Sequence, residues 1–370
     1  MTASVHDRLL ELWAAERPSA GQRVLGAVLT APSLAFGFAS GLRGFAFDRG
    51  WLQPLRSSIP VISIGGLEVG GVGKTPLVAE LVRAARLVGL EPAILTRGFG
   101  GGEWSTPRCV PREPAPTAAL DFGDEPIQLR QQVGPSTAIW VSRHRTKSAR
   151  AAAAGGASVL LLDDGFQHRQ LARDADVVCL SSRRPFANGR LLPAGPLRES
   201  PSALRRATRI VVGDVNPAAW PAIRDSLLRV LSHGPTLHAW SARPSLRAVR
   251  GLPCEPGASV TLLTGVAHPE RVARTAELLG LRIAEHRADP DHHAWTGDAL
   301  RSLAREIGDR PLVTTEKSVV PRVAYREPRY CPFVRAGGTC PPVMYVNPLC
   351  TRYWSWKAYS ALSPVVAGTE

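Results

Sequence analysis

A lysine and a threonine at the end of a glycine-rich stretch form the clearest chemical pattern in the sequence. Lys74 and Thr75 follow Gly73 directly, and Gly70 and Gly71 lie just upstream. The backbone N–H groups of such a loop surround phosphate oxygens, the lysine reaches the outer phosphates, and the threonine hydroxyl holds Mg²⁺. We therefore predict phosphoryl transfer at a nucleotide site formed by Gly70, Gly71, Val72, Gly73, Lys74, Thr75 and Pro76.

Two pairs of acidic residues supply the carboxylates that such a reaction needs. Asp163 and Asp164 follow the apolar run Ser158–Leu162. A carboxylate at the end of a buried strand, in a chain with a phosphate-binding loop, is typical of a Mg²⁺ ligand. Asp124 and Glu125 stand at the start of a helical pattern. They either cap that helix and favour its dipole, or place a general base near the phosphates.

Basic residues and histidines form a third group of candidates. Arg143 and Arg145 follow a short apolar run, and the small, rigid and basic residues of segment 188–199 suit a loop that surrounds an anion. His292 and His293 follow an aspartate. This triplet lacks a complete set of ligands for a metal ion, and a structural role and a catalytic role of the histidines both stay open.

Alternating strands and helices are needed to bring these groups together. The glycine loop lies between an apolar strand, Pro60–Ile64, and a helical pattern whose apolar residues recur every three or four positions. This context favours a phosphate-binding loop over a plain glycine turn, although Glu68 stands where the strict motif has a glycine. Further strands are expected at Pro92–Thr96, Ala138–Val141, Ser158–Leu162 and Ala175–Leu180.

The repeating strand–helix units predict an α/β fold with a P-loop kinase-like, doubly wound parallel sheet. At 370 residues, the chain is long enough for a second, smaller α/β domain. We expect an N-terminal helical segment (1–45), a nucleotide-binding domain (46–213), a smaller α/β domain that closes the active-site cleft (214–340) and a C-terminal tail (341–370).

Composition narrows the class of partner. Hydrophobic residues make up 44% of the chain, as in globular proteins, and the net charge is +14. A strongly basic chain favours an anionic partner, which is a nucleotide, a nucleic acid or a phospholipid surface. The basic residues are scattered and no aromatic-and-basic motif accompanies them, so nucleic acid is the weaker prediction. The six cysteines include no C-x-x-C pair, and reduced cytosolic thiols are favoured over a metal site at Cys331, Cys340 and Cys350.

An uncharged stretch of eighteen residues, 24–41, lies between Arg23 and Arg43. It is short for a membrane span, which needs about 20 apolar residues, and Pro32 and several glycines weaken a straight helix further. Two interpretations stay open. The stretch is either a buried core helix or an anchor in one leaflet, with Arg23, Arg43 and Trp51 at the interface.

Several longer motifs follow one another along the chain. They are GGVGKTPL (70–77), TRGFGG (96–101), GDEP (123–126), DDGFQH (163–168), NGRLLPAGPLRE (188–199), LTGVAHP (263–269), DHH (291–293) and TTEK (314–317). In this order and spacing they resemble the tetraacyldisaccharide 4'-kinases of lipid A biosynthesis, over roughly residues 10–325. The chain departs from the family pattern at Gly66, where asparagine is usual, and at Ser318, where aspartate is usual.

The resemblance implies a kinase that uses ATP and Mg²⁺ to phosphorylate the 4'-hydroxyl of a tetraacylated glucosamine disaccharide 1-phosphate. Asp124 is then the candidate general base, oriented by one of the two adjacent histidines. Arg198, with Arg143 or Arg145, neutralises phosphate charge. The implied catalytic residues are Lys74, Asp124, Arg198, His292 and His293, and the implied metal ligands are Thr75 with Asp163 or Asp164.

The resemblance also implies where the substrate binds and where the protein works. A lipid with four acyl chains stays in the bilayer, which favours the anchor interpretation of residues 24–41. We expect a membrane-associated N-terminal segment, peripheral or monotopic, on the cytoplasmic face of the bacterial inner membrane, and no nucleic acid partner. The implied substrate-binding residues are Arg97, Glu125, Arg143, Arg145, Gln167, His168, Asn188, Arg190, Arg198 and Glu199.

Two other classes of protein serve as alternatives. A GTPase or a metallochaperone-like NTPase would carry a guanine-reading N-K-x-D motif or a cysteine metal motif, and the sequence has neither. A basic nucleic-acid-binding ATPase would bind DNA with an affinity that falls as the salt concentration rises.

Overall fold

The structure is a computed structural model. It describes residues 5–15, 17–99, 101–102, 104–115, 117–213, 215, 217–231, 235–239, 243–250, 255–266, 269–289, 297–315 and 343–350. The chain forms two compact units. The described residues of unit 1 come from Met1–Thr96 and His144–Ser241, and those of unit 2 come from Arg97–Arg143 and Ala242–Tyr353.

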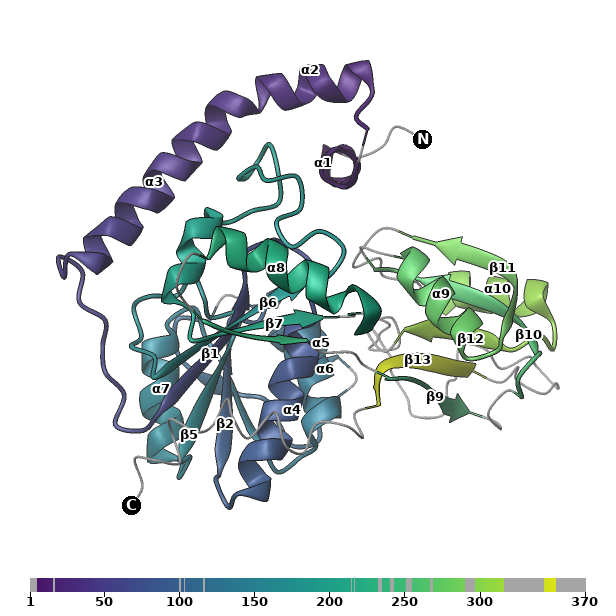
Figure 1. Cartoon of the computed structure of the whole chain (residues 1–370). Helices are drawn as coiled ribbons and strands as arrows, with labels where there is room; N and C mark the ends of the chain where they lie inside the picture. The colour runs from purple at the N-terminus through teal and green to yellow at the C-terminus, as the bar shows by residue number, and fades with distance from the viewer. Residues whose placement is uncertain are drawn as a thin grey trace. The chain divides into compact units, whose positions relative to one another are not determined.

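Unit 1 contains a parallel sheet in which six strands follow the order β2-β5-β1-β6-β7-β8. Figure 1 labels β1, β2, β5, β6 and β7 of this sheet. Every residue of β1, β2 and β5 is buried, because helices cover both faces of such a sheet. The six strands are β1 (Val61–Gly66), β2 (Pro92–Thr96), β5 (Val159–Asp163), β6 (Ala175–Ser181), β7 (Arg209–Gly213) and β8 (Thr236–Ala239).

The helices of unit 1 make the sheet doubly wound. Helix α4 (Lys74–Leu87) connects β1 to β2, and α8 (Trp220–Val230) connects β7 to β8, in the opposite direction along the sheet. Right-handed crossovers in opposite directions place their helices on opposite faces. The direction changes at β1, and ligands bind at the carboxyl ends of the strands beside such a point. Helix α7 (Arg145–Ala154) packs near β2, and two short 3₁₀ turns, η1 (Pro201–Arg206) and η2 (Pro217–Ala219), precede β7 and α8.

Three helices precede the sheet in unit 1. They are α1 (Val5–Ala14), α2 (Ala20–Val28) and α3 (Thr30–Asp48). Helix α2 begins with a capping box, in which the Ser19 hydroxyl accepts from the Gln22 N–H and the Gln22 side chain accepts from the Ser19 N–H. Helices α2 and α3 meet at a bend of 43° (Figure 1). Pro32 lies in the first turn of α3, where its missing N–H has no helical partner.

Unit 2 contains a short antiparallel pair, two helices beside it, and a separate sheet. Strands β3 (Arg108–Cys109) and β4 (Ala138–Val141) pair with each other, and the helices are α5 (Ala118–Phe122) and α6 (Asp124–Val133). The separate sheet follows the order β11-β10-β12-β13-β9, with β9 antiparallel to β13 and the other neighbours parallel. Its elements are β9 (Arg243–Arg250), β10 (Ser259–Thr264), α9 (Pro269–Leu278), β11 (Arg282–Ala288), α10 (Gly297–Ile307), β12 (Leu312–Thr315) and β13 (Val343–Cys350).

The predicted α/β class and the doubly wound parallel sheet are confirmed. Strands β2 and β4 have the predicted bounds, and β1, β5 and β6 deviate by at most two residues at either end. The sequence did not predict β9, which contains a proline and three arginines in eight residues. Such a segment has little strand pattern of its own, and its conformation depends on pairing with β13. The predicted domain boundaries at residues 45, 213 and 340 stay predictions.

Candidate active site

The glycine loop connects β1 to α4 at the carboxyl end of the sheet of unit 1. Gly70 and Gly73 have φ angles of 125° and 86°, a region that favours glycine. Helix α4 begins at Lys74, directly after Gly73. The Lys74 Nζ donates a hydrogen bond to the Gly70 carbonyl oxygen at 3.1 Å, so the side chain curls back over the loop. A glycine loop at a helix N-terminus, covered by an ammonium group, provides the donors and the positive charge that phosphate requires.

The Asp164 carboxylate lies between two cations. Its Oδ1 is 3.6 Å from the Lys74 Nζ, and its Oδ2 accepts a hydrogen bond from Arg198 at 2.6 Å. A third cation is nearby, because the buried Arg145 guanidinium donates to the Asp164 carbonyl oxygen at 3.1 Å. The three basic side chains that were predicted separately therefore gather around a single acidic residue.

These charges change the pKa of Asp164. Burial raises it, but the charges of Lys74 and Arg198, the hydrogen bond from Arg198 and the charge of Arg145 together hold it below its ordinary value. The carboxylate is therefore ionised at neutral pH. At Cys179, which pairs with Gly66 in the sheet, burial outweighs the charge of Lys74 and raises the pKa of the thiol to about 12. That thiol stays protonated at neutral pH and is a poor nucleophile.

Asp163 and Asp164 are adjacent in sequence and differ in environment. Asp163 is the last residue of β5, is 2% exposed, and accepts a hydrogen bond from the Thr96 hydroxyl at 3.2 Å. Asp164 has a φ of 48°, so the chain turns sharply there. Gly165 permits the turn, because a Cβ at that position would lie 2.6 Å from the Leu162 side chain and 2.7 Å from the Ser63 hydroxyl.

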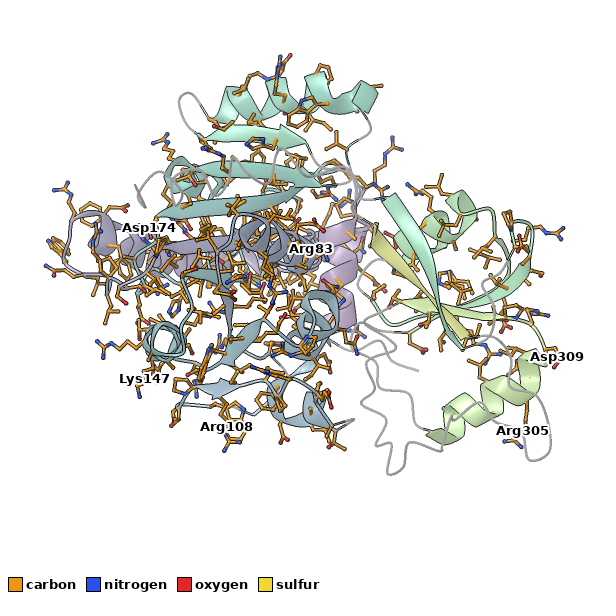
Figure 2. All side chains as sticks on the ribbon, turned by 90° about the horizontal axis from the view of Figure 1, so that it is seen from below. Arg83, Arg108, Lys147, Asp174, Arg305 and Asp309 are labelled. Atoms are coloured by element: carbon orange, nitrogen blue, oxygen red, sulfur yellow. The ribbon has the colours of Figure 1, made fainter. Side chains whose placement is uncertain are left out.

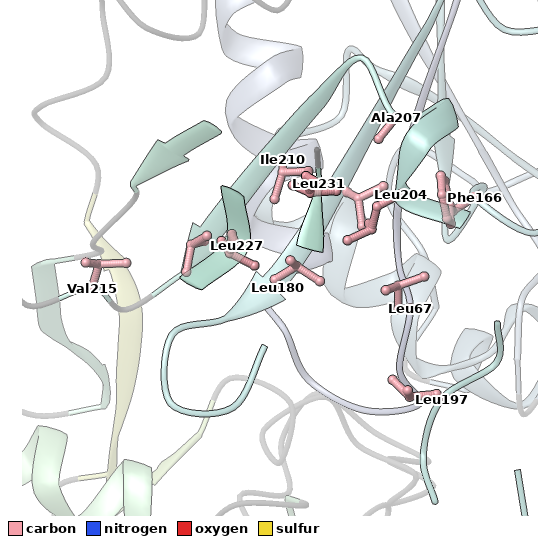
Figure 3. Close-up of a cluster of buried hydrophobic side chains, with 12 residues drawn as sticks. Leu67, Phe166, Leu180, Leu197, Leu204, Ala207, Ile210, Val215, Leu227 and Leu231 are labelled. Atoms are coloured by element: carbon pink, nitrogen blue, oxygen red, sulfur yellow. The ribbon is translucent and has the colours of Figure 1, made fainter. Parts of the chain in front are cut away.

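One hydrophobic cluster anchors the three segments that carry these groups (Figure 3). Leu67, Phe166 and Leu197 are fully buried in it, together with residues of β6, β7 and α8. Leu67 precedes the glycine loop, Phe166 lies two residues after Asp164, and Leu197 directly precedes Arg198. Packing in the cluster therefore fixes the spacing of the charged groups, because interiors are close-packed and resist displacement.

Backbone hydrogen bonds join the segment 188–199 to the glycine loop. The Val69 N–H donates to the Pro196 carbonyl at 2.9 Å, and the Arg198 N–H donates to the Leu67 carbonyl at 2.7 Å. Glu68 forms an antiparallel bridge with Leu197. An extended bridge residue carries a side chain without strain, which explains why Glu68 replaces the glycine of the strict motif.

Other predicted substrate residues have contacts inside this segment. The Asn188 amide donates to the Ala194 carbonyl at 3.2 Å, and its oxygen accepts from the Arg190 N–H. Glu199 forms an ion pair with Arg206 at 2.8 Å. These contacts shape the loop, and the predicted roles of Asn188, Arg190 and Glu199 in substrate binding stay predictions.

Gln167 and His168 follow the turn at Asp164. The Gln167 amide donates to the Gly66 carbonyl at the end of β1, at 3.0 Å. The His168 side chain is half-buried, and its carbonyl oxygen accepts from Arg173. Gly66 replaces the asparagine of the family pattern, and a Cβ there would lie 3.1 Å from the Val72 side chain. Thr75 and Pro76 are half-buried in the first turn of α4.

The remaining described candidates belong to unit 2. Asp124 is the first residue of α6 and is 9% exposed. Glycines of the TRGFGG motif support it, because a Cβ at Gly98 would lie 2.7 Å from the Phe122 carbonyl oxygen and one at Gly101 would lie 2.4 Å from the Gly123 nitrogen. The two motifs therefore pack backbone against backbone at the start of α6.

Three further candidates of unit 2 differ in exposure. Arg97 and Arg143 are exposed, and Glu125 is half-buried. His292 and His293 lie outside the described residues, so their predicted support of Asp124 stays a prediction.

Sequence reasoning missed the residues that hold the site together without facing a ligand. Leu67 precedes the glycine loop, whereas Phe166 and Leu197 are hydrophobic positions inside the motifs 163–168 and 188–199 to which no role was assigned. Thr96 ends the predicted strand 92–96 and begins the motif 96–101. The sequence did contain a signal for them. Each of these apolar or hydroxyl-bearing residues lies within two positions of a charged residue, at the end of a strand or in a loop.

A doubly wound sheet, a glycine loop at its switch point, and a paired Lys–Asp–Arg cluster define a P-loop phosphotransferase. The sequence matches the family described as tetraacyldisaccharide-1-P 4'-kinase over residues 25–334. The chain belongs to this family, and it is an ATP-dependent kinase of lipid A biosynthesis. The predicted enzyme class, an ATP-dependent lipid-sugar kinase, is thereby confirmed.

Relatives and a solved structure agree with this assignment. A tetraacyldisaccharide 4'-kinase of Anaeromyxobacter dehalogenans is 42% identical over 324 residues, which cover 84% of each chain. A tetraacyldisaccharide 4'-kinase of Halorhodospira halophila is 37% identical over 286 residues, 77% of this chain and 80% of the relative. The crystal structure of LpxK from Aquifex aeolicus in complex with ATP has the same fold, with a TM-score of 0.62 and 23% identity. That match covers 87% of this chain and 93% of the other.

Proposed function

We propose that this chain transfers the γ-phosphoryl group of ATP to the 4'-hydroxyl of a tetraacylated glucosamine disaccharide 1-phosphate at the Lys74–Asp164–Arg198 cluster. The arrangement of these three residues beside the glycine loop carries the proposal. Phosphoryl transfer needs positioning and charge neutralisation more than covalent chemistry from the protein. A cluster whose geometry is set by ion pairs provides both.

The cations supply the charge neutralisation. Lys74 exchanges its bond to the Gly70 carbonyl for the β- and γ-phosphate oxygens when ATP binds. Arg198 stays on Asp164 through one N–H and offers the rest of its guanidinium fork to the transferring phosphoryl group. Arg145 is held from behind by the Asp164 carbonyl and adds a third positive charge.

The donor set fits Mg²⁺. Thr75, Asp163 and Asp164 offer hard oxygen atoms, and within the described part of the chain the buried Asp164 Oδ1 has no hydrogen-bond partner. No group of three or more His, Cys, Asp or Glu that suits a metal ion occurs among the described residues. This agrees with Mg²⁺ bound to ATP, because such sites use one or two carboxylates and complete the shell with phosphate oxygens and water. Bound Mg²⁺ neutralises charge that develops on the phosphate oxygens.

Asp124 is the proposed general base for the sugar hydroxyl. It lies at the start of α6, where the TRGFGG backbone packs closely against Phe122 and Gly123. An ionised carboxylate accepts the hydroxyl proton as the oxygen attacks phosphorus. One of the adjacent histidines, His292 or His293, orients it in this proposal, and Arg97, Glu125 and Arg143 complete the sugar and phosphate contacts.

The lipid substrate is met at a membrane surface in this proposal. None of the described helices alone has the length and apolar character of a membrane span, whereas α2 and α3 taken together pass that test across their bend. Their outer side exposes large apolar side chains, which supports an anchor lying in one leaflet rather than a buried core helix. We name these exposed residues the lipid face; they are Val24, Val28, Leu34, Phe38 and Leu42.

Two features support the proposal that the lipid face lies at the inner leaflet of the bacterial inner membrane. The need for ATP keeps the catalytic groups in the cytoplasm. Trp51 is exposed just after α3 and suits a membrane interface, and the basic chain is attracted to anionic lipids. The protein is therefore peripheral or monotopic in this proposal, with the acylated disaccharide lipid as its partner.

A phosphate-transfer assay tests the proposal. Wild-type protein is incubated with labelled ATP and the tetraacylated disaccharide 1-phosphate in mixed detergent micelles, and the lipid fraction is counted. Transfer with ATP but not GTP supports the kinase, and absence of labelled lipid at any protein concentration contradicts it.

A parallel binding experiment tests the nucleic acid alternative. Arg83 pairs with Glu80 on α4, and Lys147 lies on α7, so these basic side chains of unit 1 sit at separate places (Figure 2). We expect no salt-dependent binding of duplex DNA at physiological salt. DNA binding that stimulates ATP hydrolysis without lipid would favour the alternative.

A further inference from the structure

Helix α3 has a second face, opposite in character to the lipid face. It consists of small residues at helical spacing, and we name it the small face: Ser33, Gly37, Ser40 and Gly44. Residues at i, i+4, i+7 and i+11 lie on one side of a helix. Small residues let another backbone approach a helix closely, and the contacts of this face show which backbone that is.

The small face contacts the segment 188–199. The Ser33 hydroxyl donates to the Leu191 carbonyl at 2.8 Å. A Cβ at Gly37 would lie 2.7 Å from the Leu191 Cδ1, closer than ordinary van der Waals contact. The Ser40 hydroxyl donates to the Arg198 carbonyl at 3.5 Å. Helix α3 therefore reaches the backbone of the residue whose side chain binds Asp164.

The end of α3 contacts a second segment of the site. Arg43 donates to the Gln167 carbonyl at 3.2 Å. Arg169 donates to the Gly44 carbonyl at 2.9 Å and to the Asp48 carboxylate at 2.7 Å. The segment 188–199 is a motif of the phosphate site, and the segment 166–169 consists of the end of the motif 163–168 and Arg169, which follows it.

On their other side, the same segments contact the glycine loop and its partners. Pro196 accepts from the Val69 N–H, and Gln167 donates to the Gly66 carbonyl. Arg198 donates to the Asp164 carboxylate. The two segments thus contact α3 on one side and the phosphate site on the other.

We propose that the small face of α3 is a positioning element for phosphoryl transfer, which holds the segment 188–199 so that Arg198 meets Asp164. The proposal rests on the kinase reaction proposed above. Because the lipid face belongs to the same helix, seating α3 on the membrane and setting Arg198 are one structural event. Gly37 and Ser33 are positioning residues in this sense, since neither lies at the reacting atoms.

A pair of glycine variants on one helix tests the proposal. Gly37→Leu drives a side chain into Leu191, whereas Gly41→Leu adds the same side chain one turn away, where no atom lies within 4 Å. Both changes favour the helix equally. We expect Gly37→Leu to lower kcat about tenfold, as displaced catalytic groups do, and Gly41→Leu to change it less than about twofold. Binding to phosphatidylethanolamine–phosphatidylglycerol vesicles is expected to be unchanged in both.

Two readouts separate positioning from a merely structural effect. In an Arg198→Ala background, Gly37→Leu should cause no further loss of kcat, because the group that it displaces is gone. Replacing Leu191 by alanine in the Gly37→Leu protein makes room for the new side chain and should restore most of the activity. Equal losses from Gly37→Leu in both backgrounds, or no rescue, would overturn the proposal.

If Gly37→Leu melts at a lower temperature than Gly41→Leu, its loss of activity could come from a disturbed fold. A variant without added bulk then tests the positioning role. Ser33→Ala removes the donor to the Leu191 carbonyl, and we expect kcat to fall about threefold with an unchanged KM for the lipid. Wild-type kcat in Ser33→Ala would sink the positioning role. A wild-type protein that labels no lipid at all contradicts the kinase proposal instead, so the two failures are distinguishable.

Discussion

Two regions of the protein differ in how their side chains are partnered. One is the phosphate end of the sheet, by which we mean the glycine loop with Lys74, Asp164 and Arg198, and the other is the lipid face of α2 and α3. At the phosphate end, charged groups already have partners, as Lys74 and Arg198 do with Asp164. On α3, Leu34 and Phe38 are 69% and 75% exposed, and the proposed membrane surface would cover them. The charged groups of the first region are paired within the protein, whereas in the proposed function the apolar groups of the second are covered by lipid.

This difference follows from what each region must do. Stabilising a transferring phosphoryl group requires donors and cations that are fixed before the reaction begins, since reorganising them costs free energy during the reaction. Binding a lipid surface requires apolar area and no particular geometry. The small face of α3 connects the two regions. It belongs to the helix that carries most of the lipid face, and it contacts the segment that carries Arg198.

Removing the Lys74 side chain should cause the largest loss of activity. Lys74→Ala deletes a charge that stabilises the transferring phosphoryl group, and kcat/KM should fall about 10²-fold or more, roughly 2.7 kcal/mol. Steady-state kinetics with labelled ATP measure the effect. Lys147→Ala on α7 is the matched control, because that lysine is exposed and lies on another helix. Near-normal turnover in Lys74→Ala would refute the phosphate cradle.

Asp124 provides a second test at the active site. Its proposed role is to accept a proton, whereas Lys74 and Arg198 are proposed to neutralise charge. Asp124→Asn keeps the shape of the side chain and loses the ability to accept a proton, so kcat should fall by about 10²-fold with little change in ATP affinity. Single-turnover kinetics and ATP titration measure the two effects separately. A parallel loss of ATP affinity would show that Asp124 supports the fold of its loop instead of the chemistry.

Breaking the lipid face should release the protein from membranes without changing the cluster. Leu34→Arg combined with Phe38→Arg puts two charges on the apolar face, where burying them in lipid is unfavourable. We expect most of the protein to move from the vesicle pellet to the supernatant in flotation or sedimentation. Leu87→Arg, an exposed apolar position on α4, should leave binding unchanged. Unfolding of the double variant would support a core helix instead.

The ionised state of Asp164 predicts a pH dependence of stability. Its pKa is lowered in the folded protein, so its contribution is complete above the unfolded value of about 3.9 and is lost as the pH falls through the lower folded pKa. Denaturation of wild type and Asp164→Asn should therefore differ by a constant free energy between about pH 5 and 8. The difference should shrink below about pH 4. The exposed Asp225→Asn control should show little difference at any pH, because exposed ion pairs contribute little.

The smallest expected effect concerns the accessibility of two cysteine thiols, one of which lies at the phosphate end of the sheet. Cys179 is buried beside Gly66 and Cys109 is exposed on β3. At pH 8, peptide mapping after brief alkylation should find Cys109 modified and Cys179 unmodified, because burial keeps the Cys179 thiol protonated. Rapid modification of Cys179 in the native protein would show that the end of β1 opens readily.

The sequence by itself determined those features of the fold and the site that depend on local residue patterns. The glycine loop, the Asp163–Asp164 pair and most strands of the sheet follow from contiguous residues, whose period and turn chemistry are readable without a fold. The family motifs likewise named Lys74, Arg198 and Asp124 in advance. A P-loop kinase of α/β class was therefore predictable from the chain alone.

Only the tertiary structure decided which of these groups meet. Arg198 and Asp164 are 34 positions apart, and Ser33 and Leu191 are 158 positions apart. The first contact depends on how Leu67, Phe166 and Leu197 pack into one cluster, and the second on how α3 packs against the segment 188–199. Packing of this kind depends on the shapes of side chains from distant segments, and no local period encodes it. The pairing of Asp164 with two cations, and the contact of α3 with the segment 188–199, therefore became visible only in the folded chain.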